Sequence, residues 1–278
     1  MKDAVVVCSG SGIHFPVYFG AFEALVENGY LPKVLCGASG GALAASIFAS
    51  LYEQNSGYVQ TVFNELKKIL SKTKLSRLIH LCPFNLMHGY LYDREGMEKY
   101  LEKISDNMKL GDIKSLSLSI IATDIDLARA QVFTSETHPD LSLAKAVMAS
   151  SAIPLVFEPV AIGNSICVDG GTVQDVPYEE VAKAIDGRKF ALFPESGAMK
   201  KSPKYSMSSW DILKRSADVF LSSADIYQLN VASDNGFEVV LFDVSYVSSI
   251  DFSAKSSVLL QEWDTGYKRM SSILNPVK

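Results

Sequence analysis

The sequence predicts an α/β fold in which a mostly parallel central sheet carries helices on both faces. Residues 4–8 and 31–36 are short, continuous apolar runs, which are typical of strands buried on both sides of a parallel sheet. Residues 15–28 lie between them and place apolar side chains at helical spacing up to an Asn-Gly end. Together these three segments form a βαβ unit. The chain has 278 residues, of which 48% are hydrophobic, and this is enough to bury a large core.

The rest of the chain continues to alternate between strand and helix patterns. Further strands are expected at residues 116–122, 131–134, 164–168, 190–193 and 237–244, the second of these being the hairpin partner of the first. Further helices are expected after residue 41, within residues 58–105, and at residues 141–149, 177–185, 210–232 and 255–274. Residues 150–160 hold two prolines and cannot be helical throughout. No repeat or linker divides the chain, so residues 1–278 are predicted to form one domain, with residues 181–278 completing the sheet and its helices.

Composition and charge exclude several classes of protein. The formal net charge of −5 does not suggest bulk nucleic-acid binding. No run of about 18 apolar residues is present, so no transmembrane helix is expected. The first residues enter a strand too directly for a signal peptide, and we expect a cytoplasmic protein that meets a membrane peripherally, from the aqueous side. The cysteines have neither metal-ligand nor disulfide spacing and indicate reduced core residues (Cys8, Cys36, Cys82 and Cys167). No metal or other cofactor is expected.

The stretch Gly37-Ala38-Ser39-Gly40-Gly41 carries the strongest functional signal. It follows a predicted strand and opens a run of helix formers, which is the context of a nucleophile elbow with the pattern Gly-x-Ser-x-Gly. Such a turn strains the serine backbone and requires small neighbours, here including Gly37 and Gly41. It presents the Ser39 hydroxyl at a helix N-terminus, where negative charge is favoured. A plain strand-to-helix turn is the alternative interpretation.

A second loop of small residues, Gly10-Ser11-Gly12, follows the first predicted strand. If the first two predicted strands are neighbours, this loop and Ser39 lie at the same carboxyl edge of the sheet. Its backbone N–H groups, above all those of Ser11 and Gly12, are then candidates for an oxyanion hole. A plain Gly-Ser connection stays open as an alternative. A dinucleotide-binding loop is disfavoured, because the third glycine position is Phe15 and no acidic residue follows the second strand.

A serine nucleophile needs a base, and the histidines do not supply a clear one. All of them lie in the first half of the chain (His14, His80, His88 and His138), so the late histidine of an α/β-hydrolase triad is missing. Asp169 is the best candidate, because it follows a predicted strand and Gly170-Gly171 allow its carboxylate to turn toward the sheet edge. A carboxylate beside Ser39 would take its proton directly, with partial burial raising its basicity. A turn with a capping aspartate is the alternative.

These motifs in this order resemble the patatin-like phospholipases, a family of serine lipid acyl hydrolases. The family's Gly-x-Ser-x-Gly elbow matches residues 37–41, its Asp-Gly-Gly motif matches residues 169–171, its serine-rich Ile-Pro segment resembles residues 149–159, and its following Val-Pro matches Val176-Pro177. The resemblance covers residues 4–180. It implies a three-layer α/β fold and a catalytic dyad without metal, in which Ser39 is the nucleophile and Asp169 the base.

The glycine-rich loop departs from the family pattern Gly-Gly-Gly-x-Arg-Gly. Gly10 and Gly12 match it, whereas Ser11, His14 and Phe15 do not. His14 stands where the family has arginine, so charge near the oxyanion becomes dependent on pH. Phe15 is expected to alter the approach of the loop or to add a contact to an acyl chain. These changes bear on rate and substrate more than on reaction type.

The resemblance implies a phospholipase A-type esterase that acts through an acyl-enzyme on phospholipids or other lipid acyl esters at a membrane surface. Two alternatives stay open. One is a lipid-binding or regulatory protein on the same fold, impaired by its altered loop. The other is a thioesterase or carboxylesterase of soluble substrates. The residues identify no protein partner, and a need for an activating one stays open.

Two further segments bear on substrate contact. Residues 80–92 are rich in aromatic and apolar side chains and follow a helix with a basic face (Lys67, Lys68, Lys72, Lys74 and Arg77). A lid or lipid-contacting surface is one interpretation. Core packing of the apolar residues, with the lysines in solvent, is the more common arrangement. A mobile surface loop is expected at residues 194–207, and specificity is expected to be set at these two loops.

Overall fold

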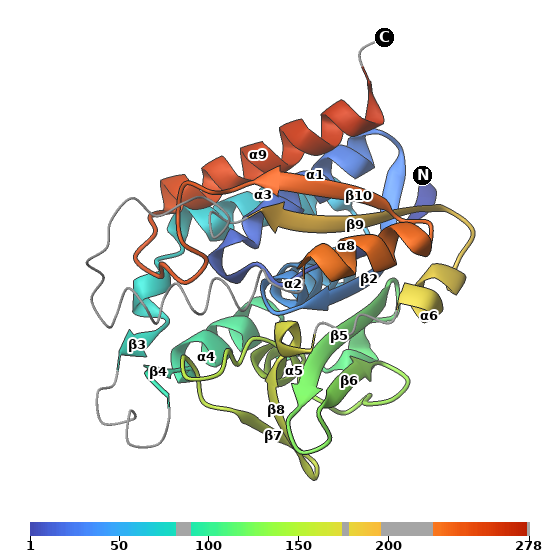
Figure 1. Ribbon diagram of the computed structural model, residues 1–278. Helices are drawn as coiled ribbons and strands as arrows, with labels where there is room; N and C mark the ends of the chain where they lie inside the picture. Colours follow the sequence, from blue (N-terminus) through green and yellow to red (C-terminus); the bar gives the residue numbers. More distant parts are fainter. Residues whose placement is uncertain (82–89, 174–177, 196–224, 277–278) are drawn as a thin grey trace.

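The computed structural model describes residues 1–81, 90–173, 178–195 and 225–276 (Figure 1). In these ranges five strands run parallel in the order β10-β9-β1-β2-β5. Their bounds are Lys2–Cys8 (β1), Tyr30–Ala38 (β2), Ser117–Asp124 (β5), Arg188–Glu195 (β9) and Glu238–Asp243 (β10). Antiparallel pairs at the β5 end of the sheet add β6 (Arg129–Thr134), β7 (Val160–Ile162) and β8 (Ser165–Asp169). The prediction of a mostly parallel central sheet is confirmed.

The register of β5 brings the ends of two other strands together. One edge of β5 pairs with β6 over residues 119–124. On the opposite edge, residues 117–121 pair with β2 and residues 122–124 pair with β8. Because β2 runs parallel to β5 and β8 runs antiparallel, the carboxyl ends of β2 and β8 meet head to head on one edge. Ala38 is opposite Ile121, and Asp169 is opposite the next residue of β5.

Helices cover both faces of the sheet, as predicted. Alternate residues of a strand face opposite sides, so Ala4, Val6 and Cys8 pack on one face whereas Val5 and Val7 pack on the other. The first face carries α1 (Pro16–Glu27), α2 (Gly40–Gln54), α3 (Val59–Lys72), α4 (Glu95–Ile104), α5 (Leu143–Ser150) and α9 (Ser256–Leu274). The second face carries α6 (Tyr178–Lys183) and α8 (Asp225–Asp234).

The expected helical region at residues 58–105 is only partly helical. It contains α3 and α4, but β3 (His80–Leu81) pairs with β4 (Tyr92–Asp93) where the sequence predicts a loop. With two residues on each side, this ladder is too short to leave a pattern of alternating side chains in the sequence. Strand β7 is likewise absent from the sequence-based expectation.

Several predicted features lie outside the described residues. They are the central part of the aromatic segment (residues 82–89), Cys82 and His88, the Val176-Pro177 pair, most of the loop at 194–207, and the first part of the helix expected at 210–232. The remaining cysteines, Cys8, Cys36 and Cys167, are free and buried, as expected. Across the ranges that the structure covers, no helix combines the length and the apolar composition needed to cross a bilayer.

The last helix packs directly against the first one (Figure 1). The backbones of α1 and α9 approach so closely that a Cβ added at Gly20 would lie 2.0 Å from the Trp263 carbonyl oxygen. A polar network on the same contact joins three helices: Glu23 accepts a hydrogen bond of 2.6 Å from the Trp263 indole and forms a 2.7 Å ion pair with Lys67 of α3. Residues near the end of the chain are therefore fixed against its beginning.

Replacing Gly266 with alanine should destabilise the protein, because a Cβ there would lie 1.9 Å from the Val17 carbonyl oxygen and α9 would have to move off α1. We expect the free energy of unfolding to fall by about 1–3 kcal/mol, as for other overpacked contacts, measured by chemical denaturation. Lys268→Ala, on the exposed side of the same helix, is the matched control and should change it by less than about 0.5 kcal/mol. Equal losses in the two variants would contradict the close-packing argument.

Candidate active site

Ser39 occupies a strained turn between β2 and α2. Its backbone has φ 52° and ψ −124°, a conformation that residues with a Cβ rarely adopt. The turn is held from outside, because the Ser39 N–H donates a 2.9 Å hydrogen bond to the Ser150 hydroxyl, which in turn donates to the Ile121 carbonyl oxygen. Small neighbours are required, since a Cβ at Gly37 would lie 2.6 Å from the Ala42 nitrogen. A strained serine between a strand and a helix, with small neighbours, is the geometry that a nucleophile elbow requires.

Asp169 reaches Ser39 because it is the last residue of β8, which meets the end of β2. Its main chain is anchored on both sides: its N–H donates to the Ala152 carbonyl oxygen at 2.9 Å, and its own carbonyl accepts from the Thr123 hydroxyl at 3.0 Å. The close approach of the next residue is also enforced, since a Cβ at Gly170 would lie 2.2 Å from the Ile121 carbonyl oxygen. The carboxylate therefore has little freedom to move away.

The Ser39 hydroxyl donates a 2.6 Å hydrogen bond to Asp169 Oδ2, and the Gly171 N–H donates to Oδ1 at 2.8 Å. Ser39 is 1% exposed and Asp169 is fully buried. Burial raises the pKa of Asp169 to about 7, while the hydrogen bonds from Ser39 and Gly171 oppose that rise. A carboxylate with a pKa near neutrality, in direct contact with a hydroxyl, has the geometry and the basicity of a general base.

The loop Gly10–Gly12 packs against this turn. A Cβ at Gly10 would lie 3.6 Å from the Ser39 Cβ, and a Cβ at Gly40 would lie 3.0 Å from the Gly12 nitrogen. Among the described residues, the N–H groups of Gly10, Ser11 and Gly12 have no hydrogen-bond acceptor. Backbone donors without partners beside a buried hydroxyl are the arrangement that an oxyanion hole requires.

The end of this loop is held by the C-terminal part of the chain. Ile13 donates its N–H to the Ser249 carbonyl oxygen at 2.9 Å, and Gly12 has φ +54° with no room for a Cβ, which would lie 2.0 Å from the same oxygen. The His14 ring is fully buried and its Nδ1 lies 2.9 Å from Oε1 of Glu262 on α9. His14 is not among the residues that line the pocket beside Ser39. Sequence reasoning missed Ser249, Glu262 and Ser150, because nothing in the local sequence shows contacts over such separations.

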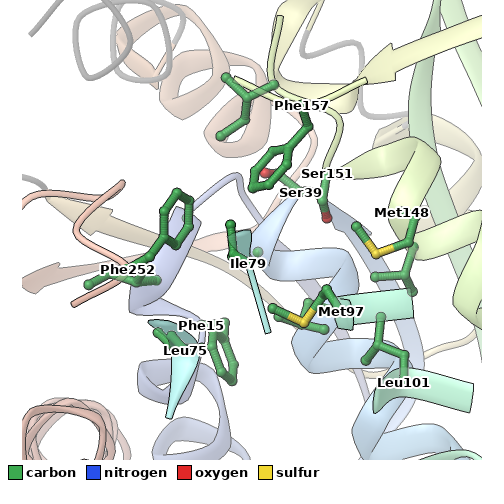
Figure 2. Close-up of a pocket in the computed structure, with 16 residues that line it drawn as sticks. Phe15, Ser39, Leu75, Ile79, Met97, Leu101, Met148, Ser151, Phe157 and Phe252 are labelled. Atoms are coloured by element: carbon green, nitrogen blue, oxygen red, sulfur yellow. The ribbon is translucent and has the colours of Figure 1, made fainter. Parts of the chain in front are cut away.

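Ser39 opens into an apolar pocket of about 570 Å³ (Figure 2). Its labelled lining comes from distant parts of the chain and includes Phe15, Leu75, Ile79, Met97, Leu101, Met148, Phe157 and Phe252. Ser39 and Ser151 contribute hydroxyl groups to this lining. A second apolar cavity, of about 340 Å³, continues between α3 and α4 and shares five lining residues with the first (Phe15, Leu43, Leu75, Met97 and Leu101).

The other titratable candidates lie elsewhere. His138 stacks edge-on against Phe133 at 5.0 Å and contacts the Thr137 hydroxyl, and His80 pairs with Asp93 in the β3–β4 ladder. Neither lines the pocket. Within the described ranges no group of three or more His, Cys, Asp or Glu side chains is placed to hold a metal ion.

The chain is similar in sequence to curated proteins that include a bacterial and a viral one. The uncharacterized protein YqhO of Bacillus subtilis is 30% identical over 197 residues, which are 62% of this chain and 64% of that protein. The probable lipid hydrolase 463L of invertebrate iridescent virus 6 is 28% identical over 107 residues, which are 34% of this chain and 36% of that protein. The chain therefore spans less than two thirds of the length of these curated relatives.

The crystal structure of VipD from Legionella pneumophila is similar in fold, with a TM-score of 0.51 at 16% identity over 98% of this chain and 66% of that chain. The family model described as patatin-like phospholipase matches residues 6–182. This match includes Ser39, Asp169 and the loop at Gly10–Gly12, and it covers more than half of the 278 residues. The chain belongs to the patatin-like phospholipase family.

Proposed function

We propose that the chain is a lipid acyl hydrolase of phospholipase A type, in which Ser39 and Asp169 form the catalytic dyad. The observation that carries this proposal is the 2.6 Å hydrogen bond from the Ser39 hydroxyl to a buried carboxylate, at the end of an apolar pocket. Membership of the patatin-like phospholipase family supports it. The similarity to a viral protein named as a probable lipid hydrolase agrees with it.

In the first half of the reaction, Ser39 Oγ attacks the carbonyl carbon of the ester and its proton passes to Asp169 Oδ2. The carbonyl oxygen becomes an oxyanion, which the N–H groups of Ser11 and Gly12 stabilise together with the N-terminus of α2. The bond between the carbonyl carbon and the alcohol oxygen then breaks. The alcohol leaves with the proton from Asp169, and the acyl group remains on Ser39.

In the second half, a water molecule loses a proton to Asp169 as its oxygen attacks the acyl carbon. The second tetrahedral intermediate collapses, the bond to Ser39 Oγ breaks, and the proton returns from Asp169 to Ser39. A carboxylic acid leaves and the dyad is restored. These steps need neither metal nor cofactor, since one carboxylate moves every proton.

The pocket supports a long apolar acyl group as the substrate portion next to Ser39. Its walls are aliphatic, thioether and aromatic side chains, so burial of each methylene of an acyl chain contributes about 0.8 kcal/mol. A dinucleotide is disfavoured as the ligand of this pocket, because its phosphate groups would lie against apolar walls. The cytoplasmic location stays a prediction, and a need for an activating partner stays open.

Ser39→Ala and Asp169→Asn should each abolish ester hydrolysis, because the first removes the nucleophile and the second removes the proton acceptor. We expect a loss of at least about a thousandfold in kcat/KM, measured as fatty acid released from phospholipid vesicles without added metal.

Probe labelling and a comparison with monomeric esters accompany that assay. A fluorophosphonate probe should label the parent protein and not Ser39→Ala. Full activity in either variant would rule out the dyad. No fatty acid release and no probe labelling of the parent would favour the lipid-binding alternative, and release only from monomeric esters would favour the soluble esterase.

The activity should depend on the ionisation of Asp169. Because the base must be ionised and burial holds its pKa at about 7, kcat/KM for a monomeric ester should rise as pH increases toward 7 and level off above it. A pH–rate profile with its inflection at about 4, the ordinary range of aspartate, would contradict this assignment.

Stability provides an independent readout of the same pKa. The folded state holds the Asp169 proton more tightly than the unfolded chain, whose aspartate pKa is about 3.9. This contribution to stability is fully present below about pH 4 and is lost as pH rises to about 7. Asp169→Asn should not show this loss, so its thermal midpoint should exceed that of the parent more at pH 8 than at pH 4.

Phe15 should limit the length of the acyl chain, because its side chain lines both the Ser39 pocket and the second cavity. Phe15→Ala should join the two spaces and shift the ratio of kcat/KM for long over short acyl esters by about tenfold toward long chains, since each methylene buried adds about 0.8 kcal/mol.

The control for this prediction is Ile153→Ala, which enlarges the first pocket at a wall that the second cavity does not share. It should leave the chain-length ratio near that of the parent. An equal shift in both variants would mean that pocket width, and not the opening at Phe15, sets the preference.

A further inference from the structure

A stretch of the chain beside the Ser39 pocket carries cationic residues and no acidic ones. Residues 66–92 contain five Lys or Arg residues and no Asp or Glu, although the whole chain has a net charge of −5. All 31 acidic residues therefore lie elsewhere in the sequence. Such a local excess against the overall charge points to an anionic partner at this place.

In the described part of this stretch, some residues line the pocket and others form a charged outer surface. Leu75 and Ile79 are buried and line the pocket, whereas Lys74 and Arg77 are exposed between and beside them. Lys68 and Lys72 are exposed one turn apart on α3. Lys67 differs from these, because it is paired with Glu23.

No ion pair joins Lys68, Lys72, Lys74 or Arg77 to an acidic side chain within the described ranges. Three acidic groups on neighbouring segments have partners of their own. Glu98 and Glu158 both lie within 4.0 Å of the Arg94 guanidinium, and Glu95 pairs with Lys99. The positive charge of the four residues is therefore not neutralised by these neighbours.

A second segment of the pocket lining carries an exposed apolar side chain. Leu155 is 61% exposed and has φ +66°, a backbone conformation that is costly for a leucine. Its turn is fixed by hydrogen bonds from the Val156 and Phe157 N–H groups to the Ile153 carbonyl oxygen, at 3.0 and 2.9 Å. Ile153 and Phe157 on either side point into the pocket, so the fold holds Leu155 outward at its mouth.

Strand β4 connects the segment that contains Leu75 and Ile79 to the segment that contains Leu155. Strand β4 pairs with β3 on one side, and on the other its Tyr92 bridges to Phe157 and donates its N–H to the Val156 carbonyl oxygen at 2.9 Å. Ile79, Phe157 and Phe252 face the same space beside Ser39 (Figure 2). Lys74, Arg77 and Leu155 each lie within two residues of a residue that lines this pocket, and Lys68 and Lys72 precede Lys74 as exposed residues of α3. We call these four cations and Leu155 the rim surface.

We propose that the rim surface docks the protein on an anionic phospholipid bilayer, with Lys68, Lys72, Lys74 and Arg77 at the headgroups and Leu155 inserted among the acyl chains. Cations near an anionic leaflet and an apolar side chain below the headgroups are the two components of reversible peripheral binding. The opening beside Ser39 then faces the lipid directly. The proposal deepens the proposed function and rests on it for the purpose of docking, but the binding itself can be measured without catalysis.

The test measures sedimentation with vesicles in the Ser39→Ala background, where no lipid is consumed. The vesicles are phosphatidylcholine alone, or phosphatidylcholine with about one third phosphatidylglycerol. We expect binding to the anionic vesicles that is at least tenfold tighter and weakens as salt increases. The triple variant Lys72→Glu, Lys74→Glu, Arg77→Glu should lose at least tenfold in affinity for the anionic vesicles. Leu155→Asn, which tolerates the same backbone conformation, should weaken binding to them at any salt concentration.

The matched control is Lys2→Glu, Lys114→Glu, Lys268→Glu, which makes the same change of net charge with exposed residues away from the rim. Lys2 begins β1 and Lys114 precedes β5, so both lie at the opposite end of the parallel strands from Ser39. This control should bind anionic vesicles nearly as the parent does. Thermal unfolding of each variant verifies that it is folded.

Equal binding to the two kinds of vesicle, or equal losses in the rim and control triples, would overturn the proposal. The two hypotheses fail separately. Anionic vesicle binding that needs the rim surface, without fatty acid release by the parent protein, would leave docking intact and remove the hydrolase. Fatty acid release that needs Ser39, with rim variants that bind as the parent does, would leave the hydrolase and remove the docking surface.

Discussion

The candidate site depends on the head-to-head meeting of β2 and β8 on one edge of β5. A parallel strand and an antiparallel strand share that edge, so the last residue of each points at the other. Ser39 and Asp169 come within 2.6 Å although 130 positions separate them. The backbone of Ser39 is strained because the chain turns out of β2 at this point. The hydrogen bond to Ser150 and the close packing at Gly37 hold the turn in this conformation. A register slip of one residue in β8 would turn the carboxylate to the opposite face of the sheet.

Burial affects the basicity of the Ser39–Asp169 pair as well as its geometry. Removing Asp169 from water is what raises its pKa, and two hydrogen bonds keep the rise from excluding the ionised form at neutral pH. Asp169 is not among the residues that line the apolar pocket beside Ser39, and the walls of that pocket would bury the acyl chain. A substitution in those walls would therefore alter the binding of the acyl chain, whereas loss of the hydrogen bond from Ser39 or Gly171 would alter the pKa of Asp169.

The sequence allows the local features of this site to be predicted, but not its long-range contacts. The predicted elbow follows from five consecutive residues between an apolar run and a helix, and strands β1 and β2 follow from two such runs, although their pairing does not. Asp169 requires more, namely the absence of a late histidine and the resemblance of its Asp-Gly-Gly motif, because no periodicity shows that β8 is antiparallel. Ser249 and Glu262 leave no local signal at all, and the left-handed turn at Leu155 contradicts the ordinary preference of leucine.

The departures at His14 and Phe15 change how the loop is held. A glycine-rich loop takes its shape from the absence of side chains, whereas this loop ends in two large ones that point in different directions. His14 is buried against Glu262 of α9, and Phe15 lines the pocket. Together with the Ile13–Ser249 hydrogen bond, they fix the loop from both sides. The N–H groups of Ser11 and Gly12 therefore derive their position from tertiary packing, much of it outside residues 6–182, where the family model ends.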